Sequence, residues 1–152
     1  MGLKITQFLA LILTALALIP GGAHLLALPN KMDLSEAQYF TVQGIYRGWA
    51  LLGIVLCAAI AADLALVIRL RRQHPAFWCA LVAFVAMAAT LAIFFIWTFP
   101  ANQVTVNWTV VPEDWRILRA QWEYSHAVNA VLTFLAFCAV ALATLLTHDE
   151  AA

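Results

Sequence analysis

Four apolar stretches constrain the fold of this 152-residue chain more than any other feature. They cover residues 5–28, 49–70, 76–99 and 127–146. Each has at least the roughly 20 residues that a helix needs to cross about 30 Å of hydrocarbon. With 65% hydrophobic and only 11% charged residues, the chain also lacks the polar side chains to cover a water-facing surface. The sequence therefore predicts an all-α integral membrane protein with four transmembrane helices.

The four predicted helices form one membrane domain, residues 1–152, in an antiparallel up-down bundle. We expect the helices at about residues 5–28, 42–71, 76–99 and 114–147, with two long loops, residues 29–40 and 100–114, on one side. The first apolar stretch follows a lysine, as in a signal peptide. However, its apolar run is longer than the usual 7–15 or so residues of such a peptide, so we expect a retained helix.

The basic residues predict how the bundle lies in the cell membrane. Residues 69–75 (RLRRQHP) form a very short basic turn, and Lys4 belongs to the same side. The positive-inside rule makes this side cytoplasmic, together with both termini. The long loops then face the periplasmic or extracellular side. The formal net charge of zero gives no basic field for nucleic acid, and nothing in the sequence indicates an oligomeric state.

The last predicted helix begins with a regular stripe of polar and aromatic side chains. Its members are spaced by 4, 3, 4 and 3 residues and are Trp115, Arg119, Trp122, His126 and Asn129. At about 100° per residue they share one helix face. Because lipid cannot satisfy polar groups, we expect this face to point into the bundle. Asp114 is the expected N-cap, and Arg119 is spaced to pair with Glu123 one turn later.

A second stripe on the second predicted helix begins with polar groups and continues into small residues. It runs through Tyr39, Gln43, Tyr46, Ala50, Gly53 and Cys57. His24 lies near the end of the first predicted helix, and His126 lies near the start of the last. In an antiparallel bundle both therefore lie at the same, non-cytoplasmic level. These positions predict a polar, aromatic-lined pocket near the non-cytoplasmic face for a hydrophobic small molecule. Its candidate residues are His24, Tyr39, Gln43, Tyr46, Arg47, Asn107, Trp108, Trp115, Arg119, Trp122, His126 and Asn129.

Several residues have simpler interpretations. Trp78 and Trp97 suit an interfacial aromatic belt at the two ends of the third helix. Asp63 is close enough to the basic turn to pair with it. The alternating residues 104–111 are typical of a short extended segment over the bundle mouth. The three cysteines form no CxxC or CxxH motif and suit small core positions, so we predict no disulfide and no zinc site.

Residues 23–55 and 107–137 resemble the anthrone-oxygenase-like family of small four-helix membrane proteins, many of which have no assigned function. The pattern W-x3-R-x2-W-x3-H at residues 115–126, preceded by Asn107 and Trp108, carries the resemblance. It implies the insertion of oxygen into an anthrone to give an anthraquinone, without a metal or flavin. An imidazole that titrates near neutral pH, His126 or His24, would be the base.

The remaining groups also suit this chemistry. Arg119 or Arg47 would hold a phenolate or peroxide, and Trp122, Trp115 and Tyr46 would stack on the rings. A quinone or any other flat hydrophobic ligand suits these residues equally well.

Three hypotheses therefore stay open, and they differ in whether the protein is an enzyme. The first is a cofactor-independent oxygenase or oxidase of a lipophilic aromatic compound, by analogy with the resembling family. The second is a haem or metal protein with His24 and His126 as ligands. The third is a non-enzymatic membrane protein that binds lipid or a partner through the long-loop side.

Overall fold

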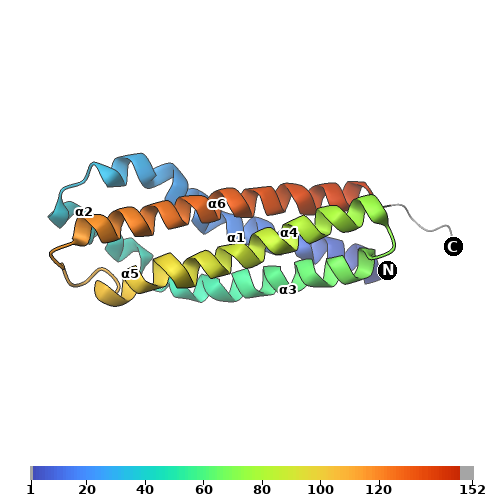
Figure 1. Cartoon of the computed structure of the whole chain (residues 1–152), viewed down its shortest axis with the longest axis horizontal. Helices are drawn as coiled ribbons and strands as arrows, with labels where there is room; N and C mark the ends of the chain where they lie inside the picture. The colour runs from blue at the N-terminus through green and yellow to red at the C-terminus, as the bar shows by residue number, and fades with distance from the viewer. Residues whose placement is uncertain (1, 148–152) are drawn as a thin grey trace.

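The computed structural model describes residues 2–147 and consists mainly of four long helices (Figure 1). These are α1 (Gly2–Met32), α3 (Gly53–Leu70), α4 (His74–Ile93) and α6 (Trp115–Leu145). Shorter elements are α2 (Glu36–Gln43), two 3₁₀ turns (Gly44–Tyr46 and Trp49–Leu52), a π-helical segment (Phe94–Thr98) and α5 (Phe99–Val104). Four segments are long and apolar enough to span a membrane: Gly2–Met32, Trp49–Leu70, His74–Val104 and Trp115–Leu145. The predicted all-α membrane protein with four transmembrane helices is confirmed.

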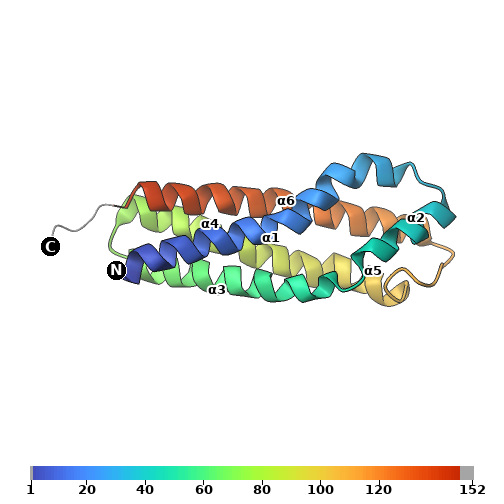
Figure 2. The same ribbon diagram turned by 180° about the vertical axis from the view of Figure 1, so that it is seen from behind.

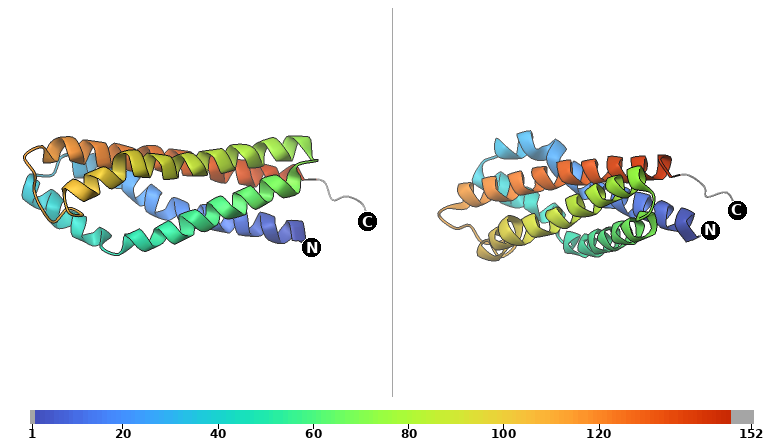
Figure 3. Two further views of the ribbon diagram at one scale, coloured as in Figure 1. Left: turned by 60° about the horizontal axis from the view of Figure 1, so that its bottom comes forward. Right: turned by 45° about the vertical axis from the view of Figure 1, so that its right-hand side comes forward.

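The long helices run alternately in opposite directions and form a closed bundle (Figures 2 and 3). α1 packs along α3 and α6, and α4 packs along the same two helices. One end of the bundle, the near end, holds residues 2 and 147 and the turn at residues 71–73. The opposite end, the far end, holds α2, α5 and the loop at residues 105–114. The far end therefore has the long connections that can build a site.

Small residues let the helices approach closely. The buried apolar residues of the near-end half are mostly alanine, and they are Ala10, Ala59, Leu66, Leu70, Ala76, Ala80, Ala83, Met87, Ala136, Ala139, Val140 and Ala143. One close crossing joins α1 to α6, where a Cβ on Gly21 would lie 3.3 Å from the Ala130 Cα atom. Large apolar side chains such as Leu26 and Ile117 are exposed, as expected for a surface that faces lipid.

The predicted single helix over residues 42–71 is broken. α2 ends at Gln43, and residues 44–52 form two 3₁₀ turns before α3 begins. Between them Arg47 is extended and Gly48 adopts φ 88°, a left-handed conformation that favours glycine. The break changes which residues of the second stripe face inward. Tyr39 and Gln43 are buried, whereas the predicted continuation at Ala50, Gly53 and Cys57 is exposed.

Residues 104–111 do not form the predicted extended segment. Val106, Asn107 and Trp108 all have positive φ values, between 49° and 63°. The Thr105 hydroxyl accepts a hydrogen bond from the Trp108 backbone N–H and donates one to the Ala101 carbonyl. The alternating pattern is not realised as a strand because local bonds close a turn and no second strand among residues 2–147 is present to pair with it.

Asp63 also differs from the expectation. It is completely buried on the inward face of α3, where the Thr14 hydroxyl of α1 donates a hydrogen bond to its carboxylate at 3.4 Å. No ion pair joins it to the basic turn among residues 2–147. The break before α3 sets this register, so the inward face runs through Ala59, Asp63 and Leu66. The three cysteines are free, but Cys57 is exposed rather than part of the core.

Candidate functional site

A cluster of five aromatic rings lies inside the far end of the bundle. His24 of α1 and His126 of α6 stack almost in parallel, with ring centroids 4.2 Å apart and an interplanar angle of 18°. The Trp122 ring meets both imidazoles edge-on, at 4.9 Å from His24 and 4.2 Å from His126. Tyr46 and Trp49, from the broken segment, cover His24 at 4.4 and 5.6 Å. We call these five residues the ring cluster.

A buried ion pair lies beside the ring cluster. Lys31 Nζ is 2.6 Å from Glu123 Oε2, and neither side chain is more than 4% exposed. The Tyr39 hydroxyl donates a hydrogen bond of 2.9 Å to Glu123 Oε1. The Lys31 ammonium also lies 5.3 Å from the centroids of both the Tyr46 and Trp122 rings, within the range of cation–π attraction. The pair thus joins α1 to α6 through charge and α2 to α6 through the tyrosine.

Lys31 determines which ring nitrogen of a neutral His24 carries the hydrogen. Its Nζ atom is 3.3 Å from His24 Nδ1. An ammonium has only donors, so Nδ1 must accept, and a neutral His24 then carries its hydrogen on Nε2. By contrast, His126 is partly exposed and has ring contacts but no recorded hydrogen bond to any residue from 2 to 147. Of the two imidazoles, His126 is therefore the one available to take a proton from a ligand.

Arg119 is a second buried cation, and it lies one turn before Glu123 on α6. Its Nη1 atom donates to the Leu34 carbonyl at 2.9 Å and to the Lys31 carbonyl at 3.5 Å. The guanidinium lies over the Trp115 and Tyr39 rings, at 4.8 and 5.4 Å from their centroids. The expected Arg119–Glu123 ion pair does not form in the described part of the chain, because Lys31 takes the carboxylate.

Trp122 of the ring cluster and Trp108 of the neighbouring loop share one hydrogen-bond acceptor. The indole N–H groups of Trp108 and Trp122 both donate to Asn102 Oδ1, at 3.1 and 2.8 Å. Trp108 also packs edge-on against Tyr39, with centroids 5.2 Å apart. Asn102 therefore fixes the loop at residues 105–114 against α6 and holds Trp122 in its orientation over the histidines.

The two tyrosines of the site stay protonated. Burial, followed by the charge of the nearby Glu123 carboxylate, raises the pKa of Tyr46 to about 12. The same two causes, in the same order, raise the pKa of Tyr39 well above its ordinary value. Tyr39 can therefore act as a hydrogen-bond donor to Glu123 throughout the ordinary pH range.

Some buried polar atoms here have no hydrogen-bond partner among residues 2–147. They include both amide atoms of Gln43, the Nε of Arg119 and the Oδ1 of Asn129. Gln43 is only 5% exposed, and Asn129 lies one turn from His126. Buried polar groups are normally paired, so these atoms are candidates to contact a bound molecule or water.

The structure brings together most of the predicted site residues. His24, Tyr46, Trp122 and His126 share ring contacts, and Tyr39, Trp108, Trp115 and Arg119 form the adjoining layer. Gln43 and Asn129 lie near them on the inward faces of α2 and α6. In contrast, Arg47 and Asn107 are exposed. The prediction omitted Lys31, Trp49, Asn102 and Glu123 from the site.

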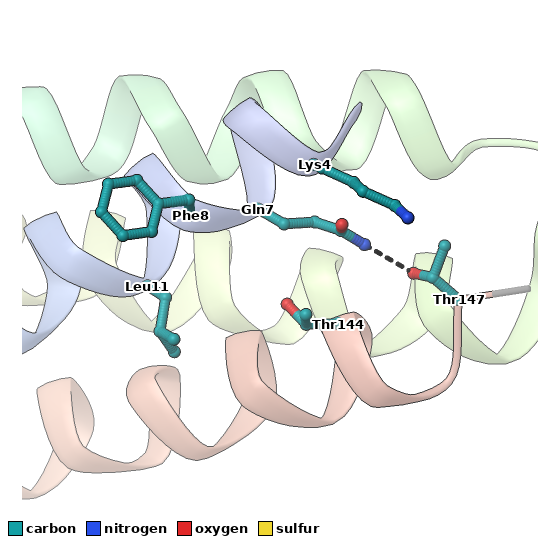
Figure 4. Close-up of a pocket in the computed structure, with 6 residues that line it drawn as sticks. All are labelled: Lys4, Gln7, Phe8, Leu11, Thr144 and Thr147. Carbon is teal, nitrogen blue, oxygen red and sulfur yellow. Dashed lines mark hydrogen bonds between the residues drawn. The ribbon is translucent and has the colours of Figure 1, made fainter. Parts of the chain in front are cut away.

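Two open grooves lie away from the ring cluster. One, of about 430 Å³, lies at the near end between α1 and α6 and is lined by Lys4, Gln7, Phe8, Leu11, Thr144 and Thr147 (Figure 4). The other, of about 330 Å³, lies at the turn between α3 and α4. Between His24 and His126 the rings themselves fill the space. A ligand at the far end must therefore displace a covering ring such as Tyr46 or Trp49.

The histidine pair does not fit a haem as it is arranged. A haem iron held by two histidines needs their nitrogens to point at it from opposite sides, whereas these rings present their faces to each other. Both rings would have to turn. Within residues 2–147, no group of three or more His, Cys, Asp or Glu side chains is placed to hold a metal ion.

A scan against models of known families, a search of curated proteins and a search of solved structures each returned no match. The fold and the site together define a four-helix membrane protein with a buried cluster of histidines, aromatic rings and charges at one end.

Proposed function

We propose that the ring cluster and the adjoining buried charges, together called the far-end cluster, bind a flat lipophilic aromatic compound. The cluster removes a proton from this compound, and the resulting anion reacts with O₂. The observation that carries this proposal is the charge balance beside His126. The buried charged residues of the far end are Lys31, Arg119 and Glu123, two cations against one carboxylate. An excess positive charge in a site shielded from water favours an anion that forms there.

His126 is the proposed base. It lacks a recorded hydrogen-bond partner in the described part of the chain, and it is partly exposed, so displacement of a covering ring would open it to a ligand. His24 is less suited to this role because its Nδ1 already faces the Lys31 ammonium. The His24 ring instead stacks on the His126 ring and holds it in position. Lys31, beside His24, would stabilise negative charge on the ligand.

The aromatic rings supply the binding surface. The ring centroids of Trp122 and Tyr46 are 5.7 Å apart, and those of Tyr46 and Trp49 are 5.0 Å apart. Tyr46 and Trp49 belong to the interrupted segment around Gly48, which has fewer regular helical hydrogen bonds to break than a continuous helix. Displacement of these two rings would admit a flat molecule beside His126.

With an anthrone as the substrate, the reaction balances without a cofactor. His126 takes one proton from the CH₂ carbon, and the carbanion gives its electrons to O₂ as a C–O bond forms. Protonation gives a hydroperoxide. Loss of the second carbon-bound proton with cleavage of the O–O bond releases one water and leaves a ketone. The substrate is the reductant and O₂ the oxidant.

Replacement of His126 by alanine should lower anthrone-dependent oxygen uptake by about 100-fold or more, because general bases contribute rate factors of roughly 10²–10⁴. Uptake is measured with an oxygen electrode on the purified protein in detergent, after subtraction of spontaneous oxidation. His74→Ala is the matched control, since His74 is exposed at the near end. Undiminished uptake in His126→Ala would contradict the assigned base.

A second candidate is a non-enzymatic membrane protein that binds lipid or a partner at the far end. The closed packing of Tyr46, Trp49 and Trp122 over His24 favours this candidate. In it, the rings serve to hold the helices together at the far end. Oxygen uptake no faster than the spontaneous rate, together with lipid that co-purifies and is lost on Trp49→Ala, would support this candidate and overturn the first.

We also propose that the near end is cytoplasmic, on the strength of its basic turn. In a variant with all three cysteines replaced by alanine, a cysteine introduced at Glu36 should react with a membrane-impermeant maleimide on intact cells. A cysteine introduced at His74 should react only after the cells are opened. Both residues are exposed in the structure, so the reverse pattern would show the opposite orientation.

A further inference from the structure

We propose that the turn between α3 and α4 binds the headgroup of an anionic phospholipid. This site is independent of the far-end cluster. The groove of about 330 Å³ at this turn is lined by Ile68, Arg69, Arg71, Arg72 and Gln73. It lies at the end of two membrane-spanning helices, the level at which lipid phosphates are found.

The charge at this turn is positive and is not neutralised by the described residues. All three arginines are exposed, and the structure records no ion pair to any of them within residues 2–147. Of the acidic side chains in that range, only Asp63 is outside the far end, and it is completely buried. Guanidinium groups bind phosphate oxygens in a fork of two hydrogen bonds, so a phosphodiester is the complementary ligand.

The shape of the site favours a lipid over a free phosphate. Leu64 and Ile68 are 42% and 55% exposed and lie one turn apart on the same face of α3, and Ile68 also lines the groove. An acyl chain can lie along this apolar face while its phosphate stays among the guanidinium groups. Because a soluble anion would use only the arginines, the apolar track distinguishes the two ligands.

The backbone holds the arginines in place. The N–H of Gln73 donates to the Leu70 carbonyl, and the N–H of Phe77 donates to the Gln73 carbonyl, both at 2.8 Å. The Arg69 guanidinium lies against the start of α1, since a Cβ on Gly2 would be 2.9 Å from its Nη1 atom. The groove is therefore formed by the end of α3 and a hydrogen-bonded turn, with the start of α1 against Arg69.

Native mass spectrometry of the full chain, with equal amounts of phosphatidylglycerol and phosphatidylcholine of matched acyl chains, tests the proposal. We expect phosphatidylglycerol adducts to exceed phosphatidylcholine adducts by about fivefold or more, and Arg71→Gln with Arg72→Gln to remove this preference. Arg71→Lys with Arg72→Lys keeps the charge but loses the bidentate hydrogen bonds of the guanidinium groups. This variant should therefore show an intermediate preference for phosphatidylglycerol.

The control is Arg47→Gln with Arg116→Gln, which removes two exposed arginines from the far end and should leave the preference unchanged. Circular dichroism checks that each variant keeps its helix content. Equal binding of both lipids by the wild type, or an equal loss in the control, would overturn the site. Displacement of phosphatidylglycerol by millimolar inorganic phosphate would show that the ligand is a soluble anion instead.

Discussion

Replacement of Glu123 by glutamine is expected to lower the free energy of unfolding by about 3–5 kcal/mol, the usual cost of removing one partner of a buried ion pair. The variant leaves the cations of Lys31 and Arg119 buried without a carboxylate. Glutamine can still accept the hydrogen bond from the Tyr39 hydroxyl, so the loss of charge is isolated. Unfolding in detergent, followed by helical circular dichroism, measures the effect.

Two further variants show whether charge is the cause. Glu36→Gln removes an exposed carboxylate from α2 and should change stability by no more than about 0.5 kcal/mol. Addition of Lys31→Met to Glu123→Gln removes the uncompensated cation as well, so most of the lost stability should return. If the double variant is less stable than Glu123→Gln alone, the uncompensated charge of Lys31 is not what destabilises the protein.

Hydropathy and residue spacing locate the site but miss the ion pair between Lys31 and Glu123 at its centre. Hydropathy ends the first helix near residue 28 and places Lys31 in a loop, whereas α1 continues through Pro29 to Met32. The spacing does contain the information. Lys31 follows His24 by seven residues and Glu123 follows Arg119 by four, so each shares an inward helix face. Which cation takes the carboxylate depends on how α1 packs on α6, which no local pattern specifies.

The helices and the stripe on α6 are better determined by the sequence. Each helix is fixed by length and apolar content, because lipid admits few alternatives to a helix. Trp115, Arg119 and Trp122 are buried as their periodicity indicates. The break at residues 44–52 is harder to foresee. Gly48 signals it weakly, since glycine is also common within membrane helices, and the inward face of α3 then depends on where the helix restarts.

Replacement of Gly21 by leucine is expected to lower the free energy of unfolding by about 1–3 kcal/mol, because it overfills the close crossing of α1 and α6. A single added Cβ would lie 3.3 Å from the Ala130 Cα atom, and that backbone atom cannot move aside as a flexible side chain can. α1 and α6 must separate there. His24 is three residues beyond Gly21 and His126 four before Ala130, so the separation also opens the 4.2 Å ring stack.

The neighbouring glycine gives a control within the same helical turn. A Cβ on Gly22 meets nothing within 4 Å, so Gly22→Leu should be neutral or stabilise the protein by up to about 1 kcal/mol through helix propensity. Both variants gain the same propensity, and the difference between their unfolding free energies therefore measures the α1–α6 contact. If the two are equally stable, close packing at Gly21 does not set the spacing. If Gly21→Leu is less stable yet keeps full anthrone-dependent uptake, the stacking of His24 on His126 is not needed by the proposed base.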